Sequence, residues 1–135
     1  LPPFQAAVAG GNVASVMCSY GSINDVSDCS NTSLYRILFN KWGFKGFVRS
    51  DLASVSDAPG AFRAGLDAIK PPATRQLTKA VGNGTLPIAK IDNAVSRILG
   101  EMFTYGLIQK PIVGKLDTKV TTGQHADVAL QAAER

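Results

Sequence analysis

Strand-like and helix-like segments alternate along this chain, and this order constrains the fold more strongly than any other feature of the sequence. Short apolar runs predict strands at Val13–Met17, Phe44–Val48 and Leu66–Ile69. Apolar residues at spacings of three and four predict helices at 34–42, 58–64, 76–81 and 91–103, and a last helix is predicted at 126–133. Strands separated by helices pair in parallel through right-handed crossovers. The sequence therefore predicts an α/β fold with a parallel sheet.

In parallel α/β folds, functional residues lie in the loops that follow the C-terminal ends of the strands. This rule selects the segments 17–20, 50–51 and 69–71. Asp51 is the only acidic residue placed directly at the end of a clearly patterned strand. A carboxylate there can act as a nucleophile, a general base or a metal ligand, and an aspartate can equally cap a helix or stabilise a turn. The residues alone leave both interpretations open.

The remaining titratable residues are weaker candidates for a catalytic or metal site. Asp92 and Glu101 fit positions within the last long helix, and Asp67 lies in a predicted strand, where a buried carboxylate requires hydrogen-bond partners. His125, the only histidine, is typical of a surface or helix-start position. One histidine and two distant cysteines do not form a zinc ligand set, and we expect neither a metal nor a cofactor.

The composition excludes several classes of protein. With 135 residues, 45% hydrophobic and 18% charged, the chain has the composition of a globular domain. The net charge of +4 is spread over single lysines and arginines, so we do not expect a nucleic-acid-binding surface. The apolar runs are only a handful of residues long, too short to span a membrane. The chain starts in mid-pattern, at Leu1-Pro2-Pro3-Phe4, which suggests a piece of a longer protein.

The two cysteines, Cys18 and Cys29, flank a segment rich in turn-forming residues. A disulfide between them would close a short loop. In a reducing compartment, two such residues would instead be free, buried thiols. The residues alone do not decide between these two states.

Five segments of the chain carry a recognisable pattern. They are residues 1–8 (LPPFQAAV), 15–20 (SVMCSY), 42–51 (WGFKGFVRSD), 64–67 (AGLD) and 91–99 (IDNAVSRIL). In this order and at this spacing they resemble the β-glucosidase branch of glycoside hydrolase family 3. The resemblance extends over nearly the whole chain, and order and spacing together make it more specific than any single motif.

The resemblance implies a partial TIM-like (β/α)8 barrel. Residues 1–110 would form the later half of this barrel, and residues 111–135 would lead toward a second, α/β sandwich domain. Asp51 would be the nucleophile of a retaining exo-β-glycosidase of the β-glucosidase type, acting on a β-glycoside. Met17 and Tyr20 would line the sugar subsite, and the acid that protonates the leaving group would lie outside this chain. Cys18 and Cys29 would form a loop disulfide like that of secreted members, so we expect a secreted protein.

Three residues depart from the family pattern. Gly21 replaces the usual Asn, Leu52 stands where an aromatic residue is common, and Lys70 stands where the last strand usually ends in Met. These departures alter the sugar subsite and motivate an alternative, a non-catalytic carbohydrate-binding or interaction module on the same scaffold. We expect the isolated chain to be inactive. We also expect it to associate with a copy of itself or with the missing barrel half, because half a barrel leaves its edge strands unpaired.

Overall fold

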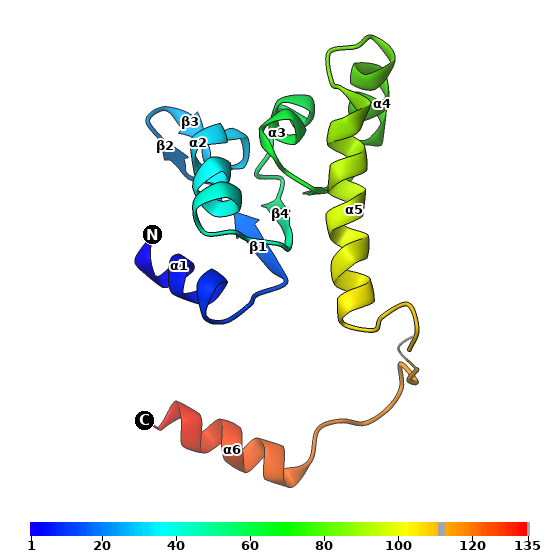
Figure 1. The fold of residues 1–135 in the computed structure, drawn as a ribbon. Coiled ribbons are helices and arrows are strands. Elements are labelled where there is room, and N and C mark those ends of the chain that lie inside the picture. The colour runs from blue at the N-terminus through cyan, green and yellow to red at the C-terminus, as the bar shows by residue number, and fades with distance from the viewer. Residues whose placement is uncertain (111–112, 135) are drawn as a thin grey trace.

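The computed structural model describes residues 1–110 and 113–134 (Figure 1). Its centre is a parallel sheet of three strands in the order β1-β4-β5, formed by Ser15–Cys18, Phe47–Leu52 and Ala68–Lys70. The central strand, β4, pairs in parallel with both neighbours. The predicted α/β class and the parallel pairing of the strands are therefore confirmed.

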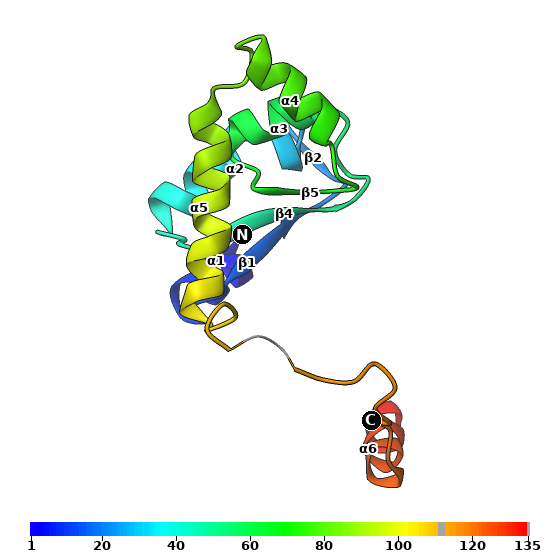
Figure 2. The same ribbon diagram turned by 90° about the vertical axis from the view of Figure 1, so that its right-hand side faces the viewer.

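Helices connect these strands and lie alongside the sheet (Figures 1 and 2). Between β1 and β4 come a short hairpin of β2 (Ser22–Ile23) and β3 (Val26–Ser27), a 3-10 turn (Asp28–Ser30), α2 (Thr32–Tyr35) and a π-helical segment (Arg36–Lys41). The other helices are α1 (Pro2–Ala9), α3 (Ala58–Ala64), α4 (Thr74–Gly82), α5 (Ile88–Thr104) and α6 (Gly123–Ala133). Figure 1 shows α6 apart from the other elements, and it has no buried residue. No helix among the described residues is long and apolar enough to cross a membrane.

The core lies between the sheet and the helices that cover one of its faces. Along β4, Val48 and Ser50 are buried on this helix-covered side, and Phe47, Arg49 and Asp51 alternate with them toward the opposite side. We call this opposite side the inner face, since a barrel carries its helices outside. The buried cluster consists of Tyr35, Leu38, Phe44, Val48, Ala61, Phe62, Leu66, Ala80, Leu86 and Ala94.

The boundaries of two strands differ from those that the sequence predicts. β4 begins at Phe47, because Phe44 instead inserts its ring into the core. Gly46 allows the close approach that starts the strand, since a Cβ there would collide with the carbonyl oxygen of Ala14, which accepts the N–H of Phe47 at 3.1 Å. β5 begins at Ala68, after Leu66 has entered the core.

Two features were not predicted from the sequence. The segment 18–33, expected as a loop, contains the β2–β3 hairpin, whose strands of two residues are too short to show a period. The helix α1 starts with two prolines, and its apolar residues are spread around the helix instead of forming the stripe on one face by which helices are recognised.

Candidate active site

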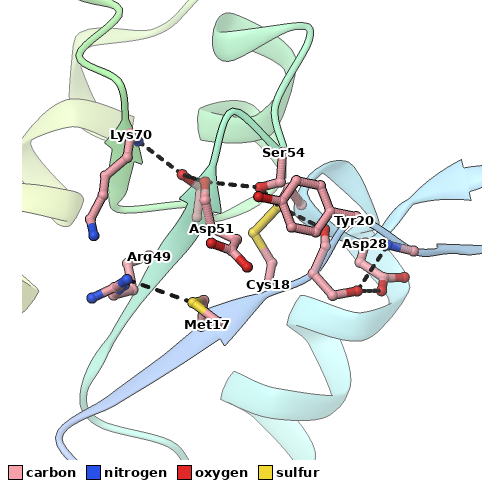
Figure 3. The surroundings of a disulfide bond; sticks show 12 residues. Met17, Cys18, Tyr20, Asp28, Arg49, Asp51, Ser54 and Lys70 are labelled. Atoms are coloured by element: carbon pink, nitrogen blue, oxygen red, sulfur yellow. Dashed lines mark hydrogen bonds between the residues drawn. A yellow bond between two sulfur atoms is a disulfide. The ribbon is translucent and has the colours of Figure 1, made fainter.

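Asp51 lies at the C-terminal end of the central strand β4, on the inner face of the sheet (Figure 3). Its Oδ1 atom accepts a hydrogen bond from the backbone N–H of Leu52 at 2.6 Å. Its Oδ2 atom makes no hydrogen bond to any residue that the structure describes. The first oxygen therefore holds the carboxylate in place, and the second is free to meet a ligand.

Two cationic side chains accompany Asp51 on this face. Arg49 lies two residues before Asp51 in β4, so both side chains are on the same face of the strand. Arg49 pairs in register with Met17 of β1, and its Nη2 lies 3.6 Å from the Met17 sulfur. The Nε atom of Arg49 is buried and has no hydrogen-bond partner among the described residues. Lys70 ends β5, opposite Leu52. Figure 3 shows the Arg49 and Lys70 side chains on the same side of Asp51.

A disulfide-closed loop lies next to the end of β4. The structure joins Cys18, at the end of β1, to Cys29 in the 3-10 turn. Within the loop, the Ser19 hydroxyl donates to the Asp28 carboxylate at 2.5 Å. The exposed side chain of Tyr20 extends from this loop, and its hydroxyl donates to the carbonyl oxygen of Leu52 at 2.5 Å. The loop is therefore attached to the residue that follows Asp51.

Hydroxyl groups also hold the backbone of Asp51. The Ser50 hydroxyl donates to the carbonyl oxygen of Asp51 at 2.8 Å, and the Ser54 hydroxyl lies 3.2 Å from the same oxygen. Ser50 is fully buried. Ser54 also lies 3.4 Å from the sulfur of Cys29, which places the disulfide against this turn.

A buried ion pair supports β4 from the helix-covered side. Asp67 accepts the N–H of Val48 at 2.8 Å through Oδ2, and its Oδ1 accepts Nε and Nη2 of Arg97 at 3.0 and 2.5 Å. The guanidinium of Arg97 stacks over the Phe39 ring, 4.7 Å from its centroid. Burial raises the pKa of Asp67 above its ordinary value, while the Arg97 and Val48 hydrogen bonds oppose this increase. The expectation that a buried Asp67 needs partners is confirmed, and these partners connect α5 to β4.

The structure brings Asp51, Met17 and Tyr20 to one edge of the sheet, and the Cys18–Cys29 bridge lies beside them. The catalytic and sugar-binding roles of these residues remain predictions. Glu101, in contrast, lines a cavity with residues that precede β1 and β4, so it belongs to the opposite end of the strands.

No role was predicted for Arg49 or for Ser50, although the segment 50–51 was selected as part of a candidate site. Arg49 shares the face of Asp51 by simple strand alternation, so the pattern that located Asp51 could also have located Arg49. The hydrogen bonds of Ser50 depend on how β4 pairs with β5, and no local pattern shows this register.

A carboxylate at the C-terminal end of a strand, in a parallel sheet with helices on one face, is the arrangement found in α/β-barrel enzymes. Residues 1–100 match the glycosyl hydrolase family 3 N-terminal domain, and the chain belongs to this family. The family's N-terminal domain is a TIM-like barrel, so the predicted partial barrel is confirmed.

Individual relatives agree with this assignment. The chain is 39% identical over 110 residues to a β-glucosidase from Wickerhamomyces anomalus, covering 78% of this chain and 13% of that protein. It superimposes on the structure of a β-glucosidase from Chaetomella raphigera with a TM-score of 0.81 and 34% identity, covering 97% of this chain and 20% of that one. A β-glucosidase from Streptomyces venezuelae, solved in complex with D-glucose, gives a TM-score of 0.73 and 30% identity over 97% of this chain and 18% of that one. The chain thus spans a fifth or less of the length of these relatives.

Proposed function

We propose that this chain is the nucleophile-bearing part of a retaining exo-β-glycosidase of the β-glucosidase type, with Asp51 as the nucleophile. The observation that carries the proposal is the position of Asp51, at the C-terminal end of the central parallel strand within the family's Gly-Phe-x-Gly-Phe-Val-x-Ser-Asp segment. Its Oδ2 makes no hydrogen bond within the described chain, so no such bond has to break before this oxygen attacks a substrate. The identity of the relatives as β-glucosidases supports the substrate class.

In the proposed reaction, the ionised carboxylate of Asp51 attacks the anomeric carbon of a β-glycoside, and the bond to the leaving oxygen breaks. A covalent glycosyl-enzyme forms, and water then hydrolyses it. A second carboxyl group must protonate the leaving oxygen from a position roughly 5–5.5 Å away from the first. Glu101 does not fit this role, because it lies toward the opposite end of the strands. The acid would therefore come from outside this chain.

Met17 and Tyr20 are proposed to form one wall of the sugar subsite. Both are exposed at the end of β1, and Met17 shares the inner face with Arg49 and Asp51. A pyranose ring has apolar C–H faces as well as hydroxyls, so a thioether and a phenol can pack against it and still leave the carboxylate accessible. These two residues would orient the sugar for attack by Asp51.

We further propose that the chain is part of a longer, secreted protein, with residues 1–110 in the barrel and 111–135 leading to a second domain. Two observations support this division: the chain covers only a fifth or less of the length of its relatives, and α6 lies apart from the other elements. The disulfide is consistent with an oxidising compartment.

The isolated chain is proposed to lack activity and to associate. β1 and β5 each have one partner strand in the described sheet, so each leaves an unpaired edge. Met17 and Leu52 are also exposed near the inner face, where the rest of a barrel would cover them. Light scattering should detect dimers or larger species of the 135-residue chain, and a well-behaved monomer would contradict this proposal.

A second candidate function is a non-catalytic carbohydrate-binding or interaction module. It is motivated by Gly21, Leu52 and Lys70, which depart from the family pattern close to Asp51. Lys70 and the 61%-exposed Leu52 lie opposite each other in the β4–β5 pairing, so both would shape the same subsite. A subsite of changed shape can retain sugar binding while losing the geometry that hydrolysis needs.

One experiment separates the two functions. The full-length protein that contains this chain would be incubated with a 2-deoxy-2-fluoro glucoside, which traps the covalent intermediate, and the label would be mapped by mass spectrometry after digestion. The catalytic proposal expects label on Asp51 and a fall in turnover of about 10⁴-fold or more in Asp51→Asn. Asp57→Asn is the matched control, because Asp57 only caps α3 through Gly60. Sugar binding without label in the folded protein, after several sugar epimers, would favour the non-catalytic module.

A further inference from the structure

The pairing of β4 with β5 is irregular beside Asp51. Arg49 pairs with Ala68, and Leu52 pairs with Lys70, so β4 advances by one residue more than β5 between these two points. Such an insertion is a β-bulge, and bulges next to active sites redirect a side chain. The inserted residue belongs to the segment Ser50–Asp51, so the bulge lies at the proposed nucleophile.

A bulge interrupts the ladder and leaves backbone groups that need other partners. Here the Ser50 hydroxyl provides them, because it accepts the N–H of Lys70 at 2.9 Å and donates to the carbonyl oxygen of Asp51 at 2.8 Å. Ser50 is fully buried, so water does not compete for these bonds. One hydroxyl group thus connects the two strands across the bulge.

The turn after Asp51 depends on the same strand. The N–H of Ala53 donates to the carbonyl oxygen of Lys70 at 2.8 Å, and Ala53 has a φ of 58°, in the left-handed region that non-glycine residues seldom adopt. The backbone of Lys70 therefore bonds to residues on both sides of Asp51. Its N–H donates to the Ser50 hydroxyl, and its carbonyl oxygen accepts the N–H of Ala53. Loss of either bond would let the Asp51 backbone shift relative to β5.

We infer that Ser50 is a positioning residue for Asp51: its buried hydroxyl closes the β4–β5 bulge and so fixes the direction of the Asp51 carboxylate on the inner face. This inference rests on the proposed role of Asp51 as the nucleophile. Ser50 itself points to the helix-covered side, where it pairs in register with Cys18, so it does not meet the substrate. Its effect must act through Asp51.

The test compares two quantities in the full-length protein, the rate at which the covalent glycosyl-enzyme forms and the affinity for D-glucose. Ser50→Ala removes the acceptor of the Lys70 N–H. We expect the rate of labelling of Asp51 by the 2-deoxy-2-fluoro glucoside to fall by about 10- to 100-fold, because a displacement of about 1 Å can cost that much. The Kd for D-glucose, measured by calorimetry, should change by less than about threefold, because one binding wall, Met17 and Tyr20, is untouched. A purely structural role for Ser50 would move both quantities or neither.

The matched control is Thr85→Ala. The Thr85 hydroxyl makes two local hydrogen bonds, to Ala80 and Asn83, and none to the Asp51 segment. Its removal should leave the labelling rate unchanged. Ser50→Thr and Ser50→Val have nearly the same shape and differ in the hydroxyl, so they provide a second comparison if Ser50→Ala does not fold. Asp51 should be labelled about 10- to 100-fold faster in the Ser50→Thr variant than in the Ser50→Val variant.

The two hypotheses fail in different ways. If the wild-type protein is labelled on another residue, the proposed role of Asp51 is wrong. The second failure begins with a wild-type protein that is labelled on Asp51. If Ser50→Ala is then labelled as fast as the wild type, or Ser50→Val as fast as Ser50→Thr, Asp51 keeps its role and the positioning role of Ser50 is overturned.

Discussion

The hydroxyl of Tyr20 donates a 2.5 Å hydrogen bond to the carbonyl oxygen of Leu52. The bond connects two segments that are distant in the sequence, the disulfide-closed loop after β1 and the last residue of β4. Leu52 also donates its N–H to the Asp51 carboxylate, so the phenol is attached to the residue that holds the proposed nucleophile. Tyr20 can therefore influence Asp51 through the backbone, in addition to its proposed contact with the sugar.

Tyr20→Phe should lower kcat/KM of the full-length protein by about 5- to 10-fold, the effect of losing one hydrogen bond worth about 1 kcal/mol. The ring remains, so any packing against the sugar is retained. The measurement is hydrolysis of an aryl β-glucoside. Tyr105→Phe is the control. The exposed Tyr105 hydroxyl lies 3.5 Å from the carbonyl oxygen of Asn12, away from Asp51, so the kcat/KM of this variant should equal that of the wild type. Equal activity of both variants would show that the Tyr20 bond does not matter.

The Cys18–Cys29 bridge should protect the loop that carries Tyr20. It closes a short loop, with a sequence separation of 11, for which chain entropy predicts about 3 kcal/mol of stabilisation. We expect the Cys18→Ala/Cys29→Ala double variant to exchange the amide hydrogens of residues 19–28 much faster, as measured by mass spectrometry. Exchange in α5 should change little, because this helix packs against β4 and α3. Unchanged exchange at 19–28 would mean that the Asp28 and Tyr20 hydrogen bonds suffice without the bridge.

The Asp67–Arg97 pair should be important for the stability of β4. Arg97→Met leaves the buried Asp67 carboxylate without its counter-charge, which costs about 3 kcal/mol when a buried pair is broken on one side. A lower Tm and faster exchange of the Val48 amide are expected.

Two variants test whether this loss arises from the pair. Asp67→Asn/Arg97→Met removes both charges and should recover part of the stability. Arg63→Met removes an exposed arginine that bonds only the carbonyl oxygen of Thr85, and it should cost less than about 1 kcal/mol. If Arg97→Met is no worse than Arg63→Met, the ion pair contributes little.

The part of the structure that follows from local patterns could be predicted from the sequence. The run of apolar residues before Asp51 located β4, and the end of a parallel strand located the candidate site, because both depend on residues close in the sequence. The same alternation places Arg49 on the face of Asp51, although the sequence interpretation overlooked it. The family motifs then suggested roles for Met17 and Tyr20 that no periodicity could show.

The remaining features depend on contacts between distant segments. The bulge at Ser50 exists only in the register of β4 against β5, and the Tyr20–Leu52 bond joins a loop to the end of β4. The β2–β3 hairpin has strands of two residues, exposes its apolar side chains Ile23 and Val26, and lies within the loop that the Cys18–Cys29 disulfide closes. Sequence patterns describe single elements, so they do not contain this information.

Alkaline pH should destabilise the fold through Tyr35. The Tyr35 hydroxyl is buried and donates to the carbonyl oxygen of Cys29 at 2.9 Å. Burial raises the pKa of Tyr35 above its ordinary value, with a smaller contribution from the Asp67 charge that Arg97 opposes. Because the pKa is higher in the folded state than in the unfolded state, the folded protein binds the proton more tightly. The corresponding stability is fully present below the unfolded pKa of about 10 and is lost as the pH rises above it.

The measurement is the free energy of unfolding of the full-length protein by urea between pH 8 and 11.5. Above pH 10 the wild type should lose up to about 1.4 kcal/mol per pH unit from this one group. Tyr35→Phe loses the hydrogen bond, which costs about 1 kcal/mol at pH 8, but it has no phenol to ionise, so its decline above pH 10 should be shallower. The two curves should therefore converge as the pH rises, and this convergence isolates Tyr35 from the exposed tyrosines and lysines, which titrate equally in both proteins. Parallel curves would mean that Tyr35 ionises without opening the structure and that its burial does not resist the charge.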